Sequence, residues 1–466
     1  MRFDFAAGVA LAWTLVSPMA YAMAVPRTNS STNSDSGLLS VLSQAVGDLS
    51  VGQKTSDTAS SILSLLDNQA DTPNSAADVG SVKDAHDKIS QVYSSVDKDS
   101  DSLLLDLVKG LVEGGLIPLN LVNLLDGYIN IDLNSISNNN PAPPSKQDLY
   151  PKKRSDDAIY SIPEEKLRAA IHIPDSFACG KNGKKPVILV PGTAVPAGMT
   201  YHFSFSQLGK ALPKADIVWV NIPRASLNDA QTNAEYVAYA INYISAVSSD
   251  SNVAAISWSQ GGLDVQWALK YWPSTRDVVE DFIAISPDFH GTDLRSLDCP
   301  LLDPLVCTPS IWQQGPETEF IHTLQSDGGN SAYVPTTTVY STFDEIVQPM
   351  SGPNASAILS DIRDIGVTNN HIQTICPNQP AGGVYLHEGV LYNPLAWALA
   401  VDALTHDGPG DPSRIDIDTV CGQILAPQLQ LDDMLGTEGI LLIALVEILT
   451  YEPKVGQEPS IAGYAS

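Results

Sequence analysis

The chain has 466 residues, with 53 acidic against 25 basic side chains and a formal net charge of −28. Such a charge repels phosphate backbones and anionic lipid surfaces, so we do not expect a nucleic-acid partner. Because the length exceeds what one hydrophobic core usually serves, we expect more than one segment, only one of which need be an enzyme-sized domain.

The N-terminus has the layout of a secretory signal peptide. A basic residue precedes an apolar stretch over residues 5–16, and the small-x-small pattern Ala20-Tyr21-Ala22 follows it. This stretch is too short to span a bilayer, and the apolar stretch over 440–449 is interrupted by a glutamate. We therefore expect a signal peptide over residues 1–22, a secreted protein and no integral membrane span; a buried N-terminal helix is the alternative.

Residues 28–146 differ in composition from the rest of the chain. They are rich in Ser, Asp, Asn and Leu, contain no cysteine, and include runs such as 102–108 that indicate short amphipathic helices. A polar, proline-containing linker leads to Lys152-Lys153-Arg154, which we interpret as a site for a processing protease; a solvated charge run is the alternative. We expect a separate helical and low-complexity propeptide over 23–154, followed by the main domain at 155–466.

After residue 155, short apolar and β-branched runs alternate with longer helical segments. Helices are predicted at 232–247 and at 262–271, the second of which ends before a proline. This alternation is typical of an α/β fold, with a mostly parallel central sheet covered by helices on both faces. Five runs bounded by turn residues predict strands at 186–190, 217–220, 253–256, 282–285 and 336–340.

The strand at 253–256 runs through Ser257-Trp258-Ser259-Gln260-Gly261-Gly262 into a helix, which is the strand–turn–helix context of a nucleophile elbow. We expect Ser259 at the tip, presented at the surface. Ser257 and Gly261 take the positions of the two glycines of the G-x-S-x-G pattern, so the first position departs from it. An ordinary helix start with a serine cap is the alternative interpretation.

A serine hydroxyl needs a base to take its proton, so an acid and a histidine should follow it in that order. Asp344 lies just past the last predicted strand, and His387 lies in a loop between two apolar stretches. His371 and His406 compete for the role of base, and order alone leaves the choice open. The sequence has no cysteine or histidine cluster with zinc spacing, so we expect no metal.

Several motifs in this region resemble the Candida antarctica lipase B family, in the same order, over about residues 175–425. The resemblance implies the α/β-hydrolase fold. It gives Ser259 the role of nucleophile, Asp344 that of the acid and His387 that of the base. The motifs are Leu189-Val190-Pro191-Gly192-Thr193, Trp258-Ser259-Gln260-Gly261-Gly262, Pro287-Asp288, Ser310-Ile311-Trp312-Gln313-Gln314, and Tyr340-Ser341 continued by Asp344-Glu345-Ile346-Val347-Gln348-Pro349.

The resemblance also implies the residues that surround the nucleophile. The backbone N–H groups of Thr193 and Gln260 form the oxyanion hole, with the Thr193 hydroxyl as a third donor. Trp258, Asp288 and Gln314 are implied to contact the substrate, and the apolar helix near the C-terminus to wall the acyl cleft. A physical argument also supports the oxyanion hole. Thr193 follows a strand at the sheet edge that adjoins the elbow, where N–H groups can converge on an oxyanion.

Secretion means an oxidising environment, where five cysteines allow two disulfides and leave one thiol. By resemblance, Cys376 and Cys421 form a family disulfide that fastens the histidine loop. Cys179 matches half of another family bridge, but its partner position holds a valine, so we expect a free thiol. Cys299 and Cys307 have no counterpart in the family, and we expect them to pair locally.

By resemblance the chain is a secreted lipase, a disulfide-bonded glycoprotein that cleaves lipophilic, triacylglycerol-type esters through a Ser-His-Asp acyl-enzyme. We expect no cofactor, and a monomer whose partner is its lipid or ester substrate. An esterase, cutinase or acyltransferase on the same fold is the first alternative, because fold and triad determine acyl transfer but not the acyl group. A catalytically inactive hydrolase-fold binding protein is the second.

Overall fold

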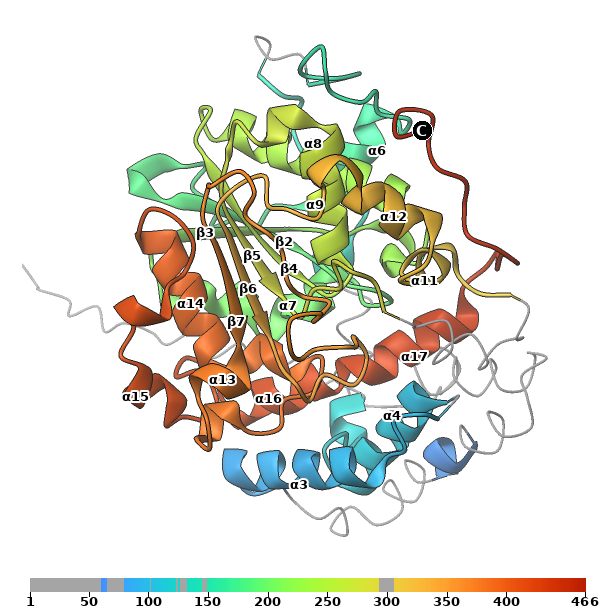
Figure 1. Cartoon of the computed structure of the whole chain (residues 1–466), viewed down its shortest axis with the longest axis vertical. Coiled ribbons are helices and arrows are strands. Elements are labelled where there is room, and N and C mark those ends of the chain that lie inside the picture. Colours follow the sequence, from blue (N-terminus) through green and yellow to red (C-terminus); the bar gives the residue numbers. More distant parts are fainter. Residues whose placement is uncertain are drawn as a thin grey trace, which may run out of the picture. The chain divides into compact units, whose positions relative to one another are not determined.

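The computed structural model shown in Figure 1 describes residues 60–64, 79–100, 102–122, 125, 132–144, 149–292 and 306–466. The expected signal peptide and Cys299 lie outside the described residues. None of the described helices is long and apolar enough to cross a lipid bilayer.

A seven-stranded sheet forms the centre of the fold, with the strand order β1-β3-β2-β4-β5-β6-β7. β1 pairs antiparallel with β3, and every other neighbouring pair is parallel. The predicted mostly parallel sheet is therefore confirmed, and each of the five predicted strands lies within an observed one. The strands are β1 (Ile171–His172), β2 (Lys185–Val190), β3 (Ala215–Val220), β4 (Val253–Trp258), β5 (Val279–Ile285), β6 (Thr336–Tyr340) and β7 (Val367–His371).

Helices cover both faces of this sheet (Figure 1). They are α3 (Val82–Ser95), α4 (Leu103–Glu113), α6 (Glu164–Ala169), α7 (Ala197–His202), α8 (Ala230–Val247), α9 (Gly261–Tyr271), α11 (Pro309–Gln313), α12 (Glu319–Gln325), α13 (Ile372–Ile375), α14 (Pro394–Thr405), α15 (Ile417–Cys421), α16 (Leu431–Glu438) and α17 (Ile440–Thr450).

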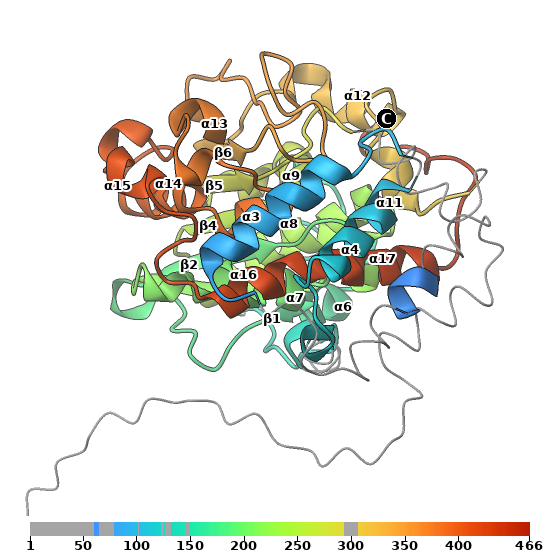
Figure 2. The same cartoon turned by 90° about the horizontal axis from the view of Figure 1, so that it is seen from below.

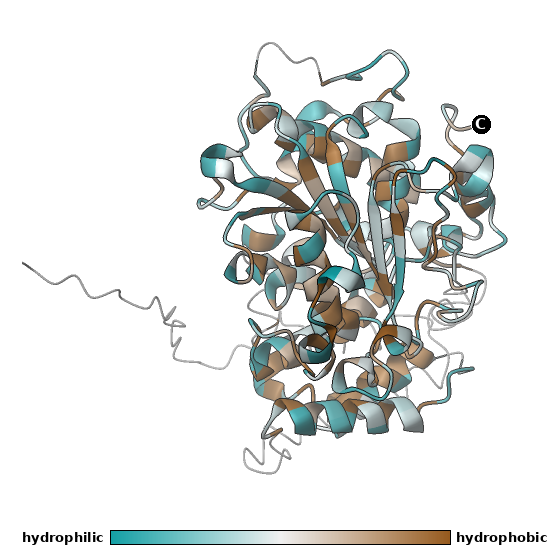
Figure 3. Ribbon diagram, turned by 60° about the vertical axis from the view of Figure 1, so that its left-hand side comes forward, coloured by the Kyte–Doolittle hydropathy of each residue, from teal (hydrophilic) through white to brown (hydrophobic). Residues whose placement is uncertain are grey.

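Successive residues of a strand point to opposite faces, and here both faces are apolar because both are covered. In β2, Val187 and Leu189 belong to the buried cluster that also contains α7, α14 and α17, whereas Ile188 and Val190 belong to the cluster that contains α8, α9 and α12. Figure 3 shows brown, hydrophobic segments in the central strands, with paler and teal strands beside them and helices of mixed colour around them. The continuous apolar runs of the sequence are explained by this two-sided burial.

The helices α3 and α4 belong to the core of the main domain, although they lie in the expected propeptide. α3 packs on α16 and α4 packs on α17, as Figure 2 shows. Side chains of α4 such as Leu105, Leu107 and Leu111 are fully buried in the cluster that also contains α17. The predicted helical character of this segment is confirmed, but both helices share the core of the main domain.

The parallel strands place the candidate site residues at one edge of the sheet. β2, β4 and β6 run in the same direction, so their carboxyl ends lie together. Thr193, Ser259 and Asp344 each follow one of these ends by a few residues. This edge is where open α/β sheets usually bind their ligands.

Candidate active site

Ser259 lies in a sharp turn between β4 and α9. Its φ of 56° lies in the left-handed region, which a residue other than glycine seldom occupies without a functional reason. Its backbone N–H donates to the Ile285 carbonyl oxygen at 3.0 Å, which ties the turn to the end of β5. Ser257, where the elbow pattern has its first glycine, is fully buried within β4, so the small hydroxymethyl group fits there.

Two glycines allow the turn to lie directly against the end of β2. A Cβ atom at Gly192 would lie 2.7 Å from the Ser259 Cβ. A Cβ atom at Gly261 would lie 2.6 Å from the carbonyl oxygens of both Val190 and Pro191. Since real Cβ atoms do not approach other atoms so closely, glycine is required at both positions for the observed contact.

The structure brings Asp344 and His387 together, although 42 residues separate them in the chain. The His387 Nδ1 and the Asp344 Oδ2 lie 2.8 Å apart, and both side chains are almost fully buried. The other carboxylate oxygen of Asp344 accepts from the N–H groups of Ile346 at 3.1 Å and Val347 at 2.7 Å. These bonds hold the carboxylate in place, and the carboxylate in turn orients the imidazole.

Ser259 and His387 line one small cavity of about 40 Å³. The expectation that Ser259 is presented at the surface is wrong, because only 3% of its surface is exposed. The cause is a cover made by α17 and, unexpectedly, by α4. The lining residues are Leu104, Thr193, Ala194, Trp258, Ser259, Ile346, His387, Leu441, Ala444 and Ile448.

Trp258 contacts the histidine as well as the cavity. Its indole Nε1 donates to the His387 carbonyl oxygen at 3.1 Å. The two rings lie with their centroids 4.8 Å apart. Trp258 therefore fixes the main chain of the histidine loop in addition to forming part of the cavity wall.

The residues predicted for an oxyanion hole adjoin Ser259. Among the described residues, neither the Thr193 nor the Gln260 backbone N–H donates to another group. The Thr193 hydroxyl donates to the Gln260 Oε1 at 2.8 Å, and the Gln314 Nε2 donates to the same oxygen at 3.1 Å. The two N–H groups are available to an oxyanion. The Thr193 hydroxyl has to break its hydrogen bond to the Gln260 side chain before it can donate to an oxyanion.

Of the three residues predicted to contact substrate, only Trp258 lines the cavity. Asp288 and Gln314 are fully buried and lie outside its lining. Burial raises the pKa of Asp288 to about 7, and the nearby Asp344 carboxylate adds to this rise. Gln314 reaches the site through two hydrogen bonds: it donates to the Gln260 Oε1 at 3.1 Å, and its own Oε1 accepts from the Thr193 hydroxyl at 3.2 Å.

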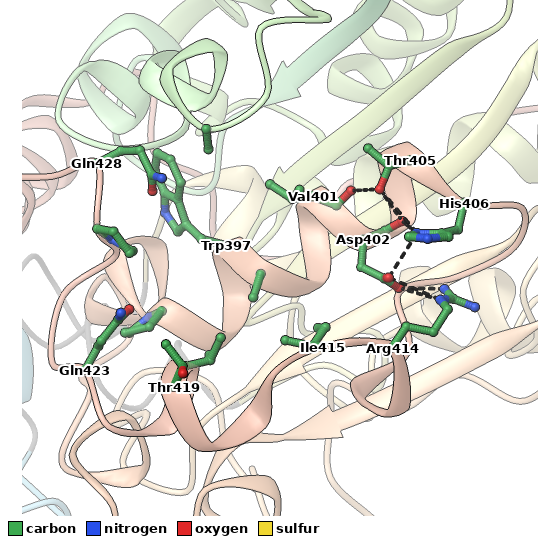
Figure 4. A pocket seen from close by; sticks show the side chains of 15 residues that line it. Trp397, Val401, Asp402, Thr405, His406, Arg414, Ile415, Thr419, Gln423 and Gln428 are labelled. Atoms are coloured by element: carbon green, nitrogen blue, oxygen red, sulfur yellow. Dashed lines mark hydrogen bonds and ion pairs between the residues drawn. The ribbon is translucent and has the colours of Figure 1, made fainter.

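The two competing histidines lie in other surroundings. His406 adjoins a separate pocket of about 420 Å³ and pairs with Asp402 at 3.0 Å, as Figure 4 shows. Arg414 shares that carboxylate at 2.6 Å, and no serine or cysteine lines the pocket. His371 bonds to two threonine hydroxyls at 2.6 and 2.7 Å. Neither histidine shares a cavity with Ser259.

The cysteines agree with the expected pattern as far as the structure describes them. A disulfide joins Cys376, after α13, to Cys421, at the end of α15, and so closes the loop that carries His387. Cys179 is in no disulfide. The pairing expected for Cys307 involves Cys299, which lies outside the described residues, and it stays a prediction.

Two features of the site were not predicted. Leu104 lines the cavity, and the apolar run that contains it was the only signal, since a sequence does not show which helix it will contact. Glu345, Glu388 and Glu438 are buried behind the histidine loop. Their signal was also weak: a glutamate beside a catalytic candidate or before an apolar helix is usually solvent-exposed.

Two lipases are similar to this chain over most of its length, although no family model matches it. The chain is 31% identical over 314 residues to lipase B of Pseudozyma antarctica, which covers 66% of this chain and 86% of that protein. A crystal structure of Aspergillus fumigatus lipase B is 62% identical and has a TM-score of 0.87, covering 92% of this chain and 100% of that chain. The chain therefore belongs to the lipase B family of serine ester hydrolases that its motifs resemble.

Proposed function

We propose that this chain cleaves lipophilic, triacylglycerol-type esters through an acyl-enzyme, with Ser259 as nucleophile, His387 as base and Asp344 as the orienting acid. One observation supports this assignment most directly. A histidine held by a buried carboxylate opens onto the same small cavity as a serine in a strained turn. This is the nucleophile, base and orienting group that acyl transfer needs.

The proposed reaction begins when His387, held at Nδ1 by Asp344, takes the Ser259 proton at its other ring nitrogen. The serine oxygen attacks the ester carbonyl, and the carbonyl oxygen becomes an oxyanion that accepts from the Thr193 and Gln260 N–H groups. Return of the proton to the alkoxy oxygen releases the alcohol and leaves the acyl-enzyme. Water then attacks the acyl carbon by the same steps, which frees the carboxylic acid and restores Ser259.

The walls of the cavity favour lipophilic acyl groups. Leu441, Ala444 and Ile448 of α17 contribute apolar side chains on one side, and Ile346 contributes another. A mainly apolar pocket with few polar groups selects by buried area more than by hydrogen bonding. An esterase, cutinase or acyltransferase with the same triad would differ in the acyl group or acceptor that it prefers.

We further propose a secreted enzyme with a signal peptide over 1–22, a propeptide over 23–154 and a mature domain over 155–466. At the proposed cleavage site, Arg154 forms surface ion pairs with Asp156 at 2.9 Å and Asp277 at 2.8 Å. A protease has to displace these bonds, which are weak because they are exposed. N-terminal sequencing of the secreted protein tests the site, and a start at residue 23 with full activity contradicts it.

Hydrolysis of p-nitrophenyl esters of graded chain length by the secreted protein tests the substrate class. We expect a kcat/KM that rises from acetate to medium and long chains. A preference for acetate favours an esterase. Fluorophosphonate labelling distinguishes a lipase or an esterase from an inactive binding protein, because only an activated serine reacts. Absence of labelling in the folded, processed protein contradicts the proposed mechanism.

A further inference from the structure

Three glutamates that the proposed mechanism does not use are buried directly behind the catalytic histidine loop. Glu345 follows Asp344, Glu388 follows His387, and Glu438 is the last residue of α16. The exposed fractions of the three glutamates are 4%, 0% and 0%. No lysine or arginine of the described residues forms an ion pair with any of them. Buried carboxylates without a cation are costly, so a folded protein seldom keeps three of them together without a function.

The first of these glutamates contacts the catalytic loop through its main chain. The Glu345 Oε2 accepts a hydrogen bond from the His387 backbone N–H at 3.1 Å. The carbonyl group of His387 accepts from Trp258. Both backbone polar groups of His387 are thus held by buried side chains, while Asp344 holds the ring. This arrangement leaves the imidazole little freedom to turn away from Ser259.

The other two glutamates connect this loop to α16. Glu388 and Glu438 are both fully buried, and they lie close enough for the charge of Glu438 to raise the pKa of Glu388. The Tyr392 hydroxyl donates to the Glu438 Oε1 at 2.6 Å. Among the described residues, no amide or hydroxyl donor reaches either oxygen of Glu388. A carboxyl group with no other donor is best satisfied by sharing a proton with its carboxyl neighbour.

The protonation of the cluster follows from its burial. Burial and the charge of Asp344 raise the pKa of Glu345 well above its usual range. Burial and the charges of Glu438 and Glu345 do the same for the pKa of Glu388. Burial also raises the pKa of Glu438 to about 7, although its hydrogen bond from Tyr392 opposes this. All three pKa values are therefore displaced in the direction that favours the protonated, uncharged carboxyl group.

We propose that Glu345 is a positioning residue for His387, and that Glu388 and Glu438 fix its loop to α16 as one proton-sharing carboxyl unit. This role rests on the proposed function of His387 as the base. The unit also connects the base to the acyl wall, because only Gly439 lies between Glu438 and the start of α17, which carries Leu441 and Ala444 in the cavity.

The proposal has a consequence for pH, because other titratable groups face the unit. Asp344 lies on its own loop, Tyr392 follows the histidine, and Tyr93 approaches from α3, where burial and the charges of Glu345 and Asp344 raise its pKa. The folded-state pKa of each glutamate lies above its unfolded value, so this stabilisation is complete at low pH and is lost as the pH rises through the folded pKa. The loss of protons as the pH rises through these raised pKa values creates unpaired buried charges that loosen the loop.

The experiment compares Glu345→Ala and Glu345→Gln in the full chain, with kcat expressed per fluorophosphonate-titrated serine. Glutamine keeps an oxygen that can accept from the His387 N–H, whereas alanine does not. We expect Glu345→Ala to lower kcat about tenfold and to leave KM within about twofold of the wild-type value, because it removes the hydrogen bond that holds the His387 backbone. We expect Glu345→Gln to keep most of kcat, because it retains this hydrogen bond. A normal kcat per titrated site in Glu345→Ala would overturn the positioning role.

A second variant keeps the proposal testable if Glu345→Ala does not fold. Glu388→Gln removes one ionisable group at constant shape, and we expect the alkaline decline of kcat and of thermal stability to move up by about one pH unit. Glu235→Gln is the matched control, because Glu235 is a buried glutamate on α8 that bonds to Ser161. It should leave the pH profile of kcat unchanged. If the alkaline decline of kcat and of thermal stability lies at the same pH in Glu388→Gln as in the wild type, the proposed role of the carboxyl unit is overturned. Absence of fluorophosphonate labelling in the wild type would instead overturn the proposed triad.

Discussion

Shortening Leu104 should speed the access of substrate to Ser259, because α4 covers the catalytic cavity. Leu104 is 3% exposed and lines the same cavity as Ser259, His387 and the α17 wall. The cavity of about 40 Å³ is small beside the ~300 to 1,000 Å³ of typical ligand pockets. An acyl chain can therefore bind only after the cover moves, and only the uncovered fraction of the protein is competent.

The size of the effect follows from the contact that is removed. Leu104→Ala deletes a buried side chain, which typically costs ~2 to 5 kcal/mol. We take about 2 kcal/mol, the lower end, because Leu104 already adjoins a cavity. Since ~1.4 kcal/mol is a tenfold change, the ratio of covered to open protein falls about 30-fold. We expect the rate of fluorophosphonate labelling, and kcat/KM for p-nitrophenyl laurate, to rise by up to this factor.

A matched control separates access from general destabilisation. Leu324 on α12 is 1% exposed and packs on the other face of the sheet. Leu324→Ala should lower the thermal midpoint by a similar amount without faster labelling. If Leu104→Ala is folded and labels no faster than the wild type, the reasoning about the cover is refuted.

The remaining predictions concern the triad, the oxyanion hole and the cysteines. Ser259→Ala should abolish ester hydrolysis and leave the thermal midpoint within about two degrees, because the hydroxyl serves chemistry and not packing; near-normal turnover would contradict the assignment. Asp344→Asn and His387→Ala should lower kcat by ~10³ or more, whereas His406→Ala should not, and the reverse result would identify a different base. Thr193→Val should lower kcat by ~10² with little change in KM if its hydroxyl turns to the oxyanion; a change in KM alone would assign the hydroxyl to ground-state binding. Non-reducing peptide mapping should find Cys376–Cys421 and Cys299–Cys307, and any intrachain bridge to Cys179 would contradict the scheme.

Much of the sheet could be predicted because its strands are buried on both faces. The strands β2, β4 and β5 each contain an apolar run, at 186–190, 253–256 and 282–285, and short apolar runs of this kind are typical of buried parallel strands. β7 was missed because its residues, Val367–His371, are mostly polar. It lies at the edge of the sheet, where a strand has only one neighbour and less of it is buried.

The candidate site could be predicted only where its residues are local in sequence. The elbow around Ser259 is one continuous segment, and its geometry is encoded by small neighbours such as Gly261. The choice between His387 and His406 was different, because each histidine lies beside a carboxylate in the structure. Only tertiary contact shows which pair shares a cavity with the serine. The burial of Glu388 and the cover by Leu104 likewise depend on contacts far apart in the chain.

The position of α4 in the core also has a consequence for how the enzyme responds to dilution. In the uncut chain α4 packs on α17 and belongs to the same polypeptide. It therefore binds as an intramolecular ligand at a high effective concentration. A cut after Arg154 would leave every apolar contact of α4 in place but would turn the cover into a separate polypeptide. Its occupancy would then follow ordinary mass action. The cut enzyme should be covered in a concentrated solution and gain activity as it is diluted, whereas the activity of the uncut chain should not depend on concentration.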